Sequence, residues 1–204
     1  IEHLMAALAG CEIDNVIVDV DGAELPVMDG SSDPFILLIE SAGVVEQDAA
    51  RRAIEIISPV RSGDDVRGVT FERGPICSIG FEIDFDSVVI GRQRRRFDFV
   101  GGAFKQDLAK ARTFGFLADS EKLRAMGLAL GGSLENAVVI DEDRVLNEGG
   151  LRFKDEFVRH KILDCVGDLY LAGAPIIGDI TALRSGHMAN NQALHDLFAD
   201  PSAY

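Results

Sequence analysis

Cysteine is scarce in this sequence, with three residues in 204. Cys11, Cys77 and Cys165 are odd in number, lie far apart and form no Cys-x-x-Cys pair, which argues against a disulfide framework and against a thiolate zinc site. We therefore expect three small, buried and unpaired side chains.

Basic residues are also few, since 20 Lys and Arg stand against 34 Asp and Glu, for a formal charge of -14. Such a chain repels a phosphate backbone, so we expect no nucleic-acid partner. No run approaches the roughly 20 apolar residues of a transmembrane helix, and no signal segment opens the visible chain. We therefore expect a cytoplasmic protein. Ile1 to Met5 read as the body of a helix with no initiating Met and no capping residue before it, which we interpret as an N-terminal truncation.

Length and composition predict a globule, because 204 residues with 47% hydrophobic content can bury a sizeable core. Helical and strand periods alternate without regular βαβ units, which favours an α+β fold. Apolar and polar residues alternate from Cys77 to Phe85, so this segment is predicted to be a strand buried on one face. Residues 154–172 are broadly apolar and predict a long helix packed between other elements. Other strands are predicted at 15–20, 54–57, 92–99, 137–140 and 176–183, and other helices at the start of the chain, 32–43, 104–110, 120–126 and 188–199.

Four arginines gather in the predicted strand 92–99, at positions 92, 94, 95 and 96. Two interpretations stay open for this positive charge in an acidic protein. We favour a solvated edge strand that resists aggregation over a phosphate site.

Polar groups on the long helix need partners if they are buried. His160 and Asp164 are four residues apart, so both can point at one ion. A histidine bonded to an aspartate one turn away is the common structural alternative. Together with His3, the pair supplies two imidazoles and one carboxylate, with a fourth position free for water. This ligand set suits Zn²⁺, and Fe²⁺ is chemically possible.

Two further histidines remain in the chain. His187 follows Ser185 and Gly186, whose small size would let its ring approach a substrate. Asp168 lies one turn beyond Asp164, so it could accept a hydrogen bond from His187 and hold that ring cationic. His195 is expected to be structural, and a capping or solvent-exposed role is the alternative for His187.

Six ordered blocks of the sequence resemble one known family, the UDP-3-O-acyl-N-acetylglucosamine deacetylases, through which Gram-negative bacteria make lipid A. The blocks are residues 2–8 (EHLMAAL), 28–31 (MDGS), 111–116 (ARTFGF), 145–148 (VLNE), 151–164 (LRFKDEFVRHKILD) and 185–187 (SGH). The resemblance implies two similar small domains, each a sheet with two helices, with the helices sandwiched between the sheets. Residues 1–49 would be the later part of domain one, with its first strands missing. Residues 50–204 would be domain two, with an acyl-chain-binding insert at about 114–143.

The same resemblance implies roles for individual residues. It implies a zinc-dependent deacetylase that releases acetate from a UDP-sugar lipid, acting as a monomer. His3, His160 and Asp164 match metal ligands, and Glu2 matches the general base. His187 matches the residue that stabilises the oxyanion and assists the leaving amine, and Asp168 matches its supporting partner. Thr113 matches a residue near the scissile carbonyl, Lys161 one near the substrate's phosphates, and Phe85 one that contacts the uridine. The residues matched to the acyl passage are Phe114, Phe116, Leu117, Met126, Leu128 and Leu130.

Two other classes of function stay open on the sequence alone. Two histidines and one carboxylate with open positions also occur in non-haem iron oxygenases. An inactive fragment that serves only as a scaffold is the non-catalytic alternative.

Overall fold

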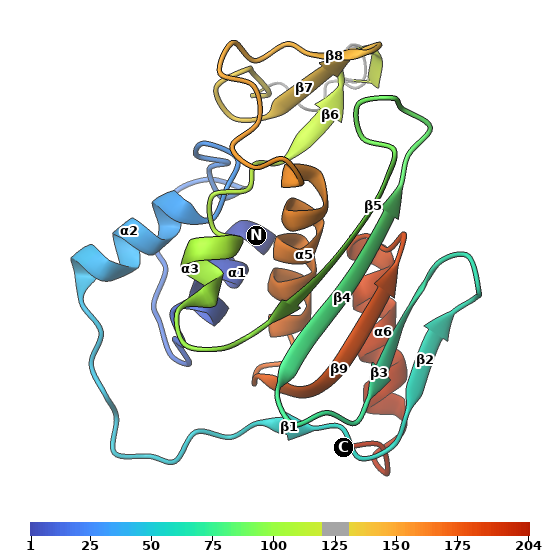
Figure 1. Ribbon diagram of the computed structural model, residues 1–204. Coiled ribbons are helices and arrows are strands. Elements are labelled where there is room, and N and C mark those ends of the chain that lie inside the picture. Colours follow the sequence, from blue (N-terminus) through green and yellow to red (C-terminus); the bar gives the residue numbers. More distant parts are fainter. Residues whose placement is uncertain (120–130) are drawn as a thin grey trace.

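The computed structural model describes residues 1–119 and 131–204, and it has the predicted α+β class (Figure 1). Most strands form one large sheet, with helices packed on one side of it. No helix in the described part of the chain is long and apolar enough to span a membrane.

The large sheet has the strand order β2-β3-β9-β4-β5, and the short β1 pairs with β9. The central strand β9 runs antiparallel to β3 and parallel to β4, with Ile180 beside Phe71 on one side and Ile79 on the other. These three side chains belong to the buried core. The strands are β1 (Ile54–Glu55), β2 (Val60–Gly63), β3 (Gly68–Glu72), β4 (Cys77–Asp84), β5 (Arg92–Asp98) and β9 (Ile176–Leu183).

The long helix α5 (Glu156–Tyr170) lies between the sheet and α1 (Glu2–Gly10). Twelve of its fifteen residues are buried, as its apolar composition predicts. Helix α6 (His187–Ala199) packs beside α5 and covers β2 and β3. On the other side, α2 (Asp33–Ala42) packs on α1, and the short α3 (Ala103–Asp107) follows β5. The position of α5 gives its polar residues access to both α1 and α6.

A separate small sheet lies at one end of α5 (Figure 1). It consists of β6 (Phe114–Phe116), β7 (Val138–Asp141) and β8 (Arg144–Val145), in that order. Strands β6 and β7 lie near the two ends of the segment in which we expect an insert, and β6 brings Phe114 and Phe116 close to Phe85 at the end of β4.

Most predicted elements are confirmed, with one clear error. The strand predicted at 15–20 is wrong, because this segment forms no strand and pairs with none in the described part of the chain. Its side chains Val16, Ile17 and Val18 are exposed. A strand needs a neighbouring edge to supply hydrogen bonds, and the apolar pattern of the segment does not by itself provide one. The helix predicted at 120–126 lies outside the described residues.

The arginine-rich strand β5 is an edge strand, as we favoured. Arg92 and Arg94 both bind Glu82 across the strand pair, and they cover this carboxylate so that it is buried. The expectation that β4 is buried on one face only is therefore wrong, since arginines of the neighbouring strand cover its polar face. All three cysteines are free, but only Cys165 is fully buried.

Candidate active site

Three carboxylate and imidazole groups follow one face of α5 at four-residue intervals. His160, Asp164 and Asp168 are each buried, with exposed fractions of 2%, 3% and 8%. Four residues make slightly more than one helical turn, so these groups form a single buried polar strip along the helix. Removing such groups from water is costly unless they are paired or bind an ion.

Helix α1 brings His3 to this strip from the other end of the chain. His3 Nε2 lies 3.8 Å from Asp164 Oδ1, and His160 Nε2 lies 3.2 Å from the same oxygen. The two imidazole rings are in edge contact, with centroids 5.0 Å apart. One potential ligand atom from each of the three residues lies within 4.8 Å of the others, so together they could hold a single metal ion.

The hydrogen bonds around this cluster fit a metal site. His160 Nδ1 donates to the main-chain carbonyl of Ala111 at 3.0 Å, so in a neutral ring Nε2 would carry the lone pair and face Asp164. The buried Oδ1 of Asp164 has no hydrogen-bond donor among the described residues. Two acceptor atoms that face each other without a proton between them repel, and a cation removes this repulsion. An outer hydrogen bond to a carbonyl is the usual way to orient a ligating histidine.

The charge states of the cluster also suit a cation. Burial and the neighbouring His160 lower the pKa of His3 to about 4, so this imidazole is neutral at pH 7. Burial by itself would raise the pKa of Asp164, but His160 and Lys161 outweigh it and hold that pKa below its usual value. Neutral imidazole and ionised carboxylate are the forms that coordinate a metal.

Glu2 and His187 lie beside the cluster. Their side chains approach to 3.8 Å, between His187 Nε2 and Glu2 Oε1, and together with Asp164 they form a second group of potential ligand atoms. His187 Nδ1 is 2.9 Å from Asp168 Oδ2, and this hydrogen bond raises the pKa of His187 against the opposing effect of burial. The expected pairing of His187 with Asp168 is therefore present.

The geometry agrees with comparisons to known proteins. The model of the family described as UDP-3-O-acyl N-acetylglycosamine deacetylase matches residues 1–199. This chain is 52% identical to the proteins named UDP-3-O-acyl-N-acetylglucosamine deacetylase in Shewanella frigidimarina and Pasteurella multocida. It is 50% identical to the protein of the same name in Xanthomonas campestris. Each match covers 100% of this chain and 67–68% of the relative. The chain belongs to this deacetylase family.

Membership of the deacetylase family directs attention to the residues expected to contact substrate. Phe85 contacts both Phe114 and Phe116, with ring centroids 5.7 and 6.3 Å away, and Phe114 lies 6.2 Å from the ring of His160. The three phenylalanines therefore form one aromatic surface that leads to the metal cluster. Leu117 follows at the end of this segment and is partly buried, whereas Met126, Leu128 and Leu130 lie outside the described residues.

Lys161 and Thr113 also lie near the cluster. Lys161 Nζ donates to Asp164 Oδ2 at 2.8 Å, so it neutralises the carboxylate oxygen that does not face the histidines. The backbone of Thr113 pairs with Gly30 on one side and Val138 on the other. This pairing fixes Thr113 at the junction between the small sheet and the loop before α2.

Sequence reasoning missed several residues that position the site. Asn190 donates to Asp168 Oδ2 at 2.8 Å and accepts from Ser185 at 2.6 Å, so it holds the carboxylate that faces His187. Asn190 is buried and lies one turn after His187 on α6. Glu156, one turn before His160, is also buried. The four-residue spacing from Glu156 through Asp168 was visible in the sequence and was the signal that could have revealed Glu156.

Proposed function

We propose that this chain is a zinc-dependent amide hydrolase that removes the N-acetyl group from UDP-3-O-acyl-N-acetylglucosamine and releases acetate, a step of lipid A synthesis. The convergence of His3, His160 and Asp164 beside Glu2 and His187 carries this proposal. The names of its relatives supply the substrate class. We also propose that it acts as a monomer.

In this proposal His3, His160 and Asp164 hold the metal ion. Two imidazoles and one carboxylate, with a position left open, are a donor set that catalytic zinc favours, and Fe²⁺ is the alternative. A divalent ion in this place would polarise the amide carbonyl and lower the pKa of a coordinated water to about 7.

Glu2 and His187 divide the proton transfers between them. Glu2 Oε1 lies 3.8 Å from His187 Nε2, and as a carboxylate Glu2 could accept a proton from the attacking water. The hydrogen bond to Asp168 raises the pKa of His187 and so favours its cationic form, which could donate to the developing oxyanion and then to the leaving amine. A positioned general base typically contributes about 10²–10⁴-fold in rate.

The surroundings of the cluster suit a substrate with a polar head and an acyl chain. A cavity of about 570 Å³ opens beside Glu2 and His3 and is lined by Phe35 and the loop 23–27. The aromatic surface of Phe85, Phe114 and Phe116 approaches from the small sheet. We propose that this surface and Leu117 bind apolar parts of the substrate, while Thr113 lies near the scissile carbonyl and Lys161 near the phosphates.

We also propose the domain division that the family resemblance implies. Residues 1–49 contribute α1 and α2, which would belong to domain one, and residues 50–204 contribute the large sheet, α5 and α6. The small sheet supports an insert at about 114–143 within domain two. Limited proteolysis would test this division, since cleavage should concentrate in the unpaired segment 43–53.

The decisive experiment measures zinc content and acetate release together. Glu2→Gln and His187→Ala should each keep stoichiometric zinc but lose at least about 100-fold in rate, because each removes a group needed in the transition state. His195→Ala is the matched control, because His195 is an exposed histidine on the same helix as His187. Full activity in either variant would refute the role assigned to that residue.

The same preparation separates the other two classes of function. Acetate release under anaerobic conditions would exclude an oxygen-dependent iron enzyme. Oxygen consumption that depends on an oxoacid would instead favour it. A purified chain that binds no divalent metal would favour the inactive scaffold.

A further inference from the structure

The side chain of Glu156 is the centre of a buried polar network next to the site. Glu156 is fully buried at the N-terminus of α5. Its Oε1 accepts from the backbone N–H of Arg112 at 3.0 Å and from Arg112 Nε at 2.9 Å. Its Oε2 accepts from Arg112 Nη2 at 3.2 Å and from the backbone N–H of Arg152 at 2.6 Å. One carboxylate thus joins the distant segment at Arg112 to the turn at Arg152, just before its own helix.

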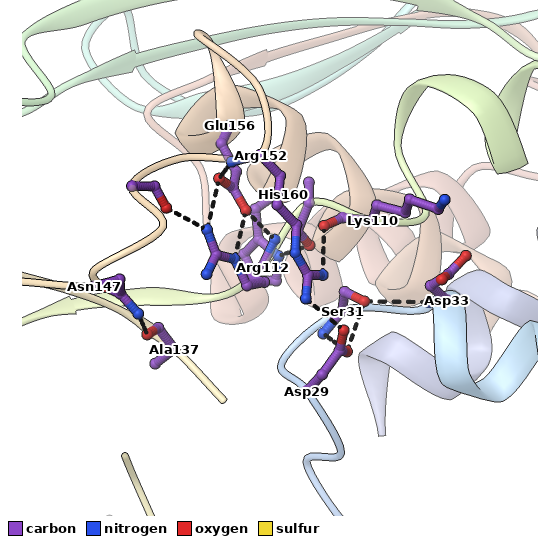
Figure 2. A network of polar contacts seen from close by, with 12 residues as sticks. Asp29, Ser31, Asp33, Lys110, Arg112, Ala137, Asn147, Arg152, Glu156 and His160 are labelled. Carbon is purple, nitrogen blue, oxygen red and sulfur yellow. Dashed lines mark hydrogen bonds and ion pairs between the residues drawn. The ribbon is translucent and has the colours of Figure 1, made fainter. Parts of the chain in front are cut away.

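One branch of this network leads to His160. Glu156 fixes both the main chain and the side chain of Arg112, and the preceding residue, Ala111, supplies the carbonyl that accepts from His160 Nδ1 (Figure 2). The position of that carbonyl determines which nitrogen of His160 carries the proton and where its other nitrogen points. Glu156 therefore acts on His160 through the segment 111–112.

The other branch leads to His3. Arg152 forms an ion pair with Asp29 at 2.9 Å, and Asp29 Oδ1 accepts from both the backbone and the hydroxyl of Ser31 (Figure 2). The next residue, Ser32, is fully buried and donates from its hydroxyl to the carbonyl of His3 at 2.8 Å. The backbone that carries His3 is therefore tied to the same network.

We propose that Glu156 is a positioning residue that holds His3 and His160 in place relative to each other through one hydrogen-bonded network. Ser32 is the residue through which this network contacts α1. This inference rests on the proposed function, because it assumes that the two histidines bind a metal. It adds residues that touch neither metal nor substrate but fix the groups that do.

The chemistry of Glu156 explains why a carboxylate is needed there. All of its four partners are donors, and an ionised carboxylate offers only acceptors. In Glu156→Gln one oxygen becomes an NH₂ group, so at least two donors of the network would face another donor. The size of the side chain stays the same, so the substitution tests the hydrogen bonds rather than the packing.

The test measures the affinity of the metal-free chain for Co²⁺ and the visible spectrum of the complex, neither of which requires substrate. Glu156→Gln should weaken Co²⁺ binding about 10- to 100-fold, as loss of outer-shell partners of a metal site typically does. Ser32→Ala should weaken it about 3- to 10-fold, the equivalent of one hydrogen bond. Both variants should change the intensity of the visible bands, because the spectrum of Co²⁺ reports the arrangement of its ligands.

Two matched controls separate positioning from general loss of stability. Glu82→Gln alters another buried glutamate that accepts from two arginines, Arg92 and Arg94, but on β4 and β5. Ser62→Ala removes another buried serine hydroxyl, which binds Asp196. Both controls should bind Co²⁺ as tightly as the unaltered chain does, even if their melting temperatures fall as far as those of Glu156→Gln and Ser32→Ala.

Each outcome decides the inference. Unchanged affinity and spectrum in both Glu156→Gln and Ser32→Ala would overturn it while the metal site itself still stood. Equal weakening in the controls would also overturn it, since the effect would then follow stability. If the unaltered chain bound no Co²⁺, the proposed function would fail first and this inference with it. If Glu156→Gln did not fold, the comparison of Ser32→Ala with Ser62→Ala would decide.

Discussion

The main-chain carbonyl oxygen of Glu2 lies only 2.1 Å from the position that a Cβ atom on Gly167 would occupy. Gly167 is in the last turn of α5, so α1 crosses this helix at a residue without a side chain. The close crossing brings the start of α1, with Glu2 and His3, onto the polar face of α5. Packing of two backbones thus places groups from opposite parts of the chain in one site.

Gly167→Ala should disturb this crossing. The added methyl group overlaps the Glu2 carbonyl, so α1 must move away, and overpacking of this kind typically costs about 1–3 kcal/mol. We expect a lower melting temperature and weaker metal binding, because His3 moves with α1. Gly80→Ala is a suitable control, since the nearest atom to a Cβ there is 3.9 Å away. Metal binding that survives Gly167→Ala unchanged would show that the crossing does not position His3.

Metal binding should stabilise the fold in a way that depends on His160. A ligand that binds only the folded state adds about 2.7 kcal/mol when its free concentration is 100 times its dissociation constant. Zn²⁺ should therefore raise the melting temperature of the unaltered chain and of His195→Ala, but should not raise that of His160→Ala. Calorimetry with and without a chelator measures the difference. An equal rise in all three proteins would place the ion elsewhere.

The pH dependence of stability should reveal the pair of His187 and Asp168. The bond to Asp168 raises the pKa of His187 above its ordinary value of 6.5. A raised histidine pKa stabilises the fold fully below the unfolded value, and this stabilisation is lost as pH rises through the folded value. Asp168→Asn should therefore destabilise the chain more at pH 5.5, which is below the unfolded value, than at pH 9.

Nuclear magnetic resonance gives the direct measurement. The ring protons of His187 should titrate at lower pH in Asp168→Asn than in the unaltered chain. The exposed His195 provides an internal reference, since its titration should be the same in both. An unchanged His187 titration would mean that Asp168 does not hold this ring cationic.

Thiol reactivity should follow burial. Burial raises the pKa of Cys77 to about 12 and raises that of Cys165 well above its ordinary value. Because the thiolate is the reactive form, both should resist alkylation in the folded protein at pH 8. Cys11, whose pKa is also raised but which is more accessible, should react first. Peptide mapping after a short alkylation measures the order, and rapid native labelling of Cys165 would contradict its buried position.

Local sequence patterns predicted the elements well wherever one feature dominated. The period of two predicted β4, and the broad apolar character of residues 156–170 predicted a helix buried on most sides. The strand predicted at 15–20 failed because pairing depends on a partner that the segment does not itself contain. The burial of Glu82 was missed for the same reason, since arginines of the neighbouring strand cover it.

By itself the sequence determined the kinds of ligand available and their spacing on α5, because His160, Asp164 and Asp168 share a helical face whatever surrounds them. It also carried the blocks by which the family resemblance was found. Only the tertiary structure decided that His3 lies against that face and that Glu156 joins the segments holding both histidines. These relationships depend on a close crossing at Gly167 and on hydrogen bonds between distant segments, and helical or strand periodicity describes only neighbours along one element.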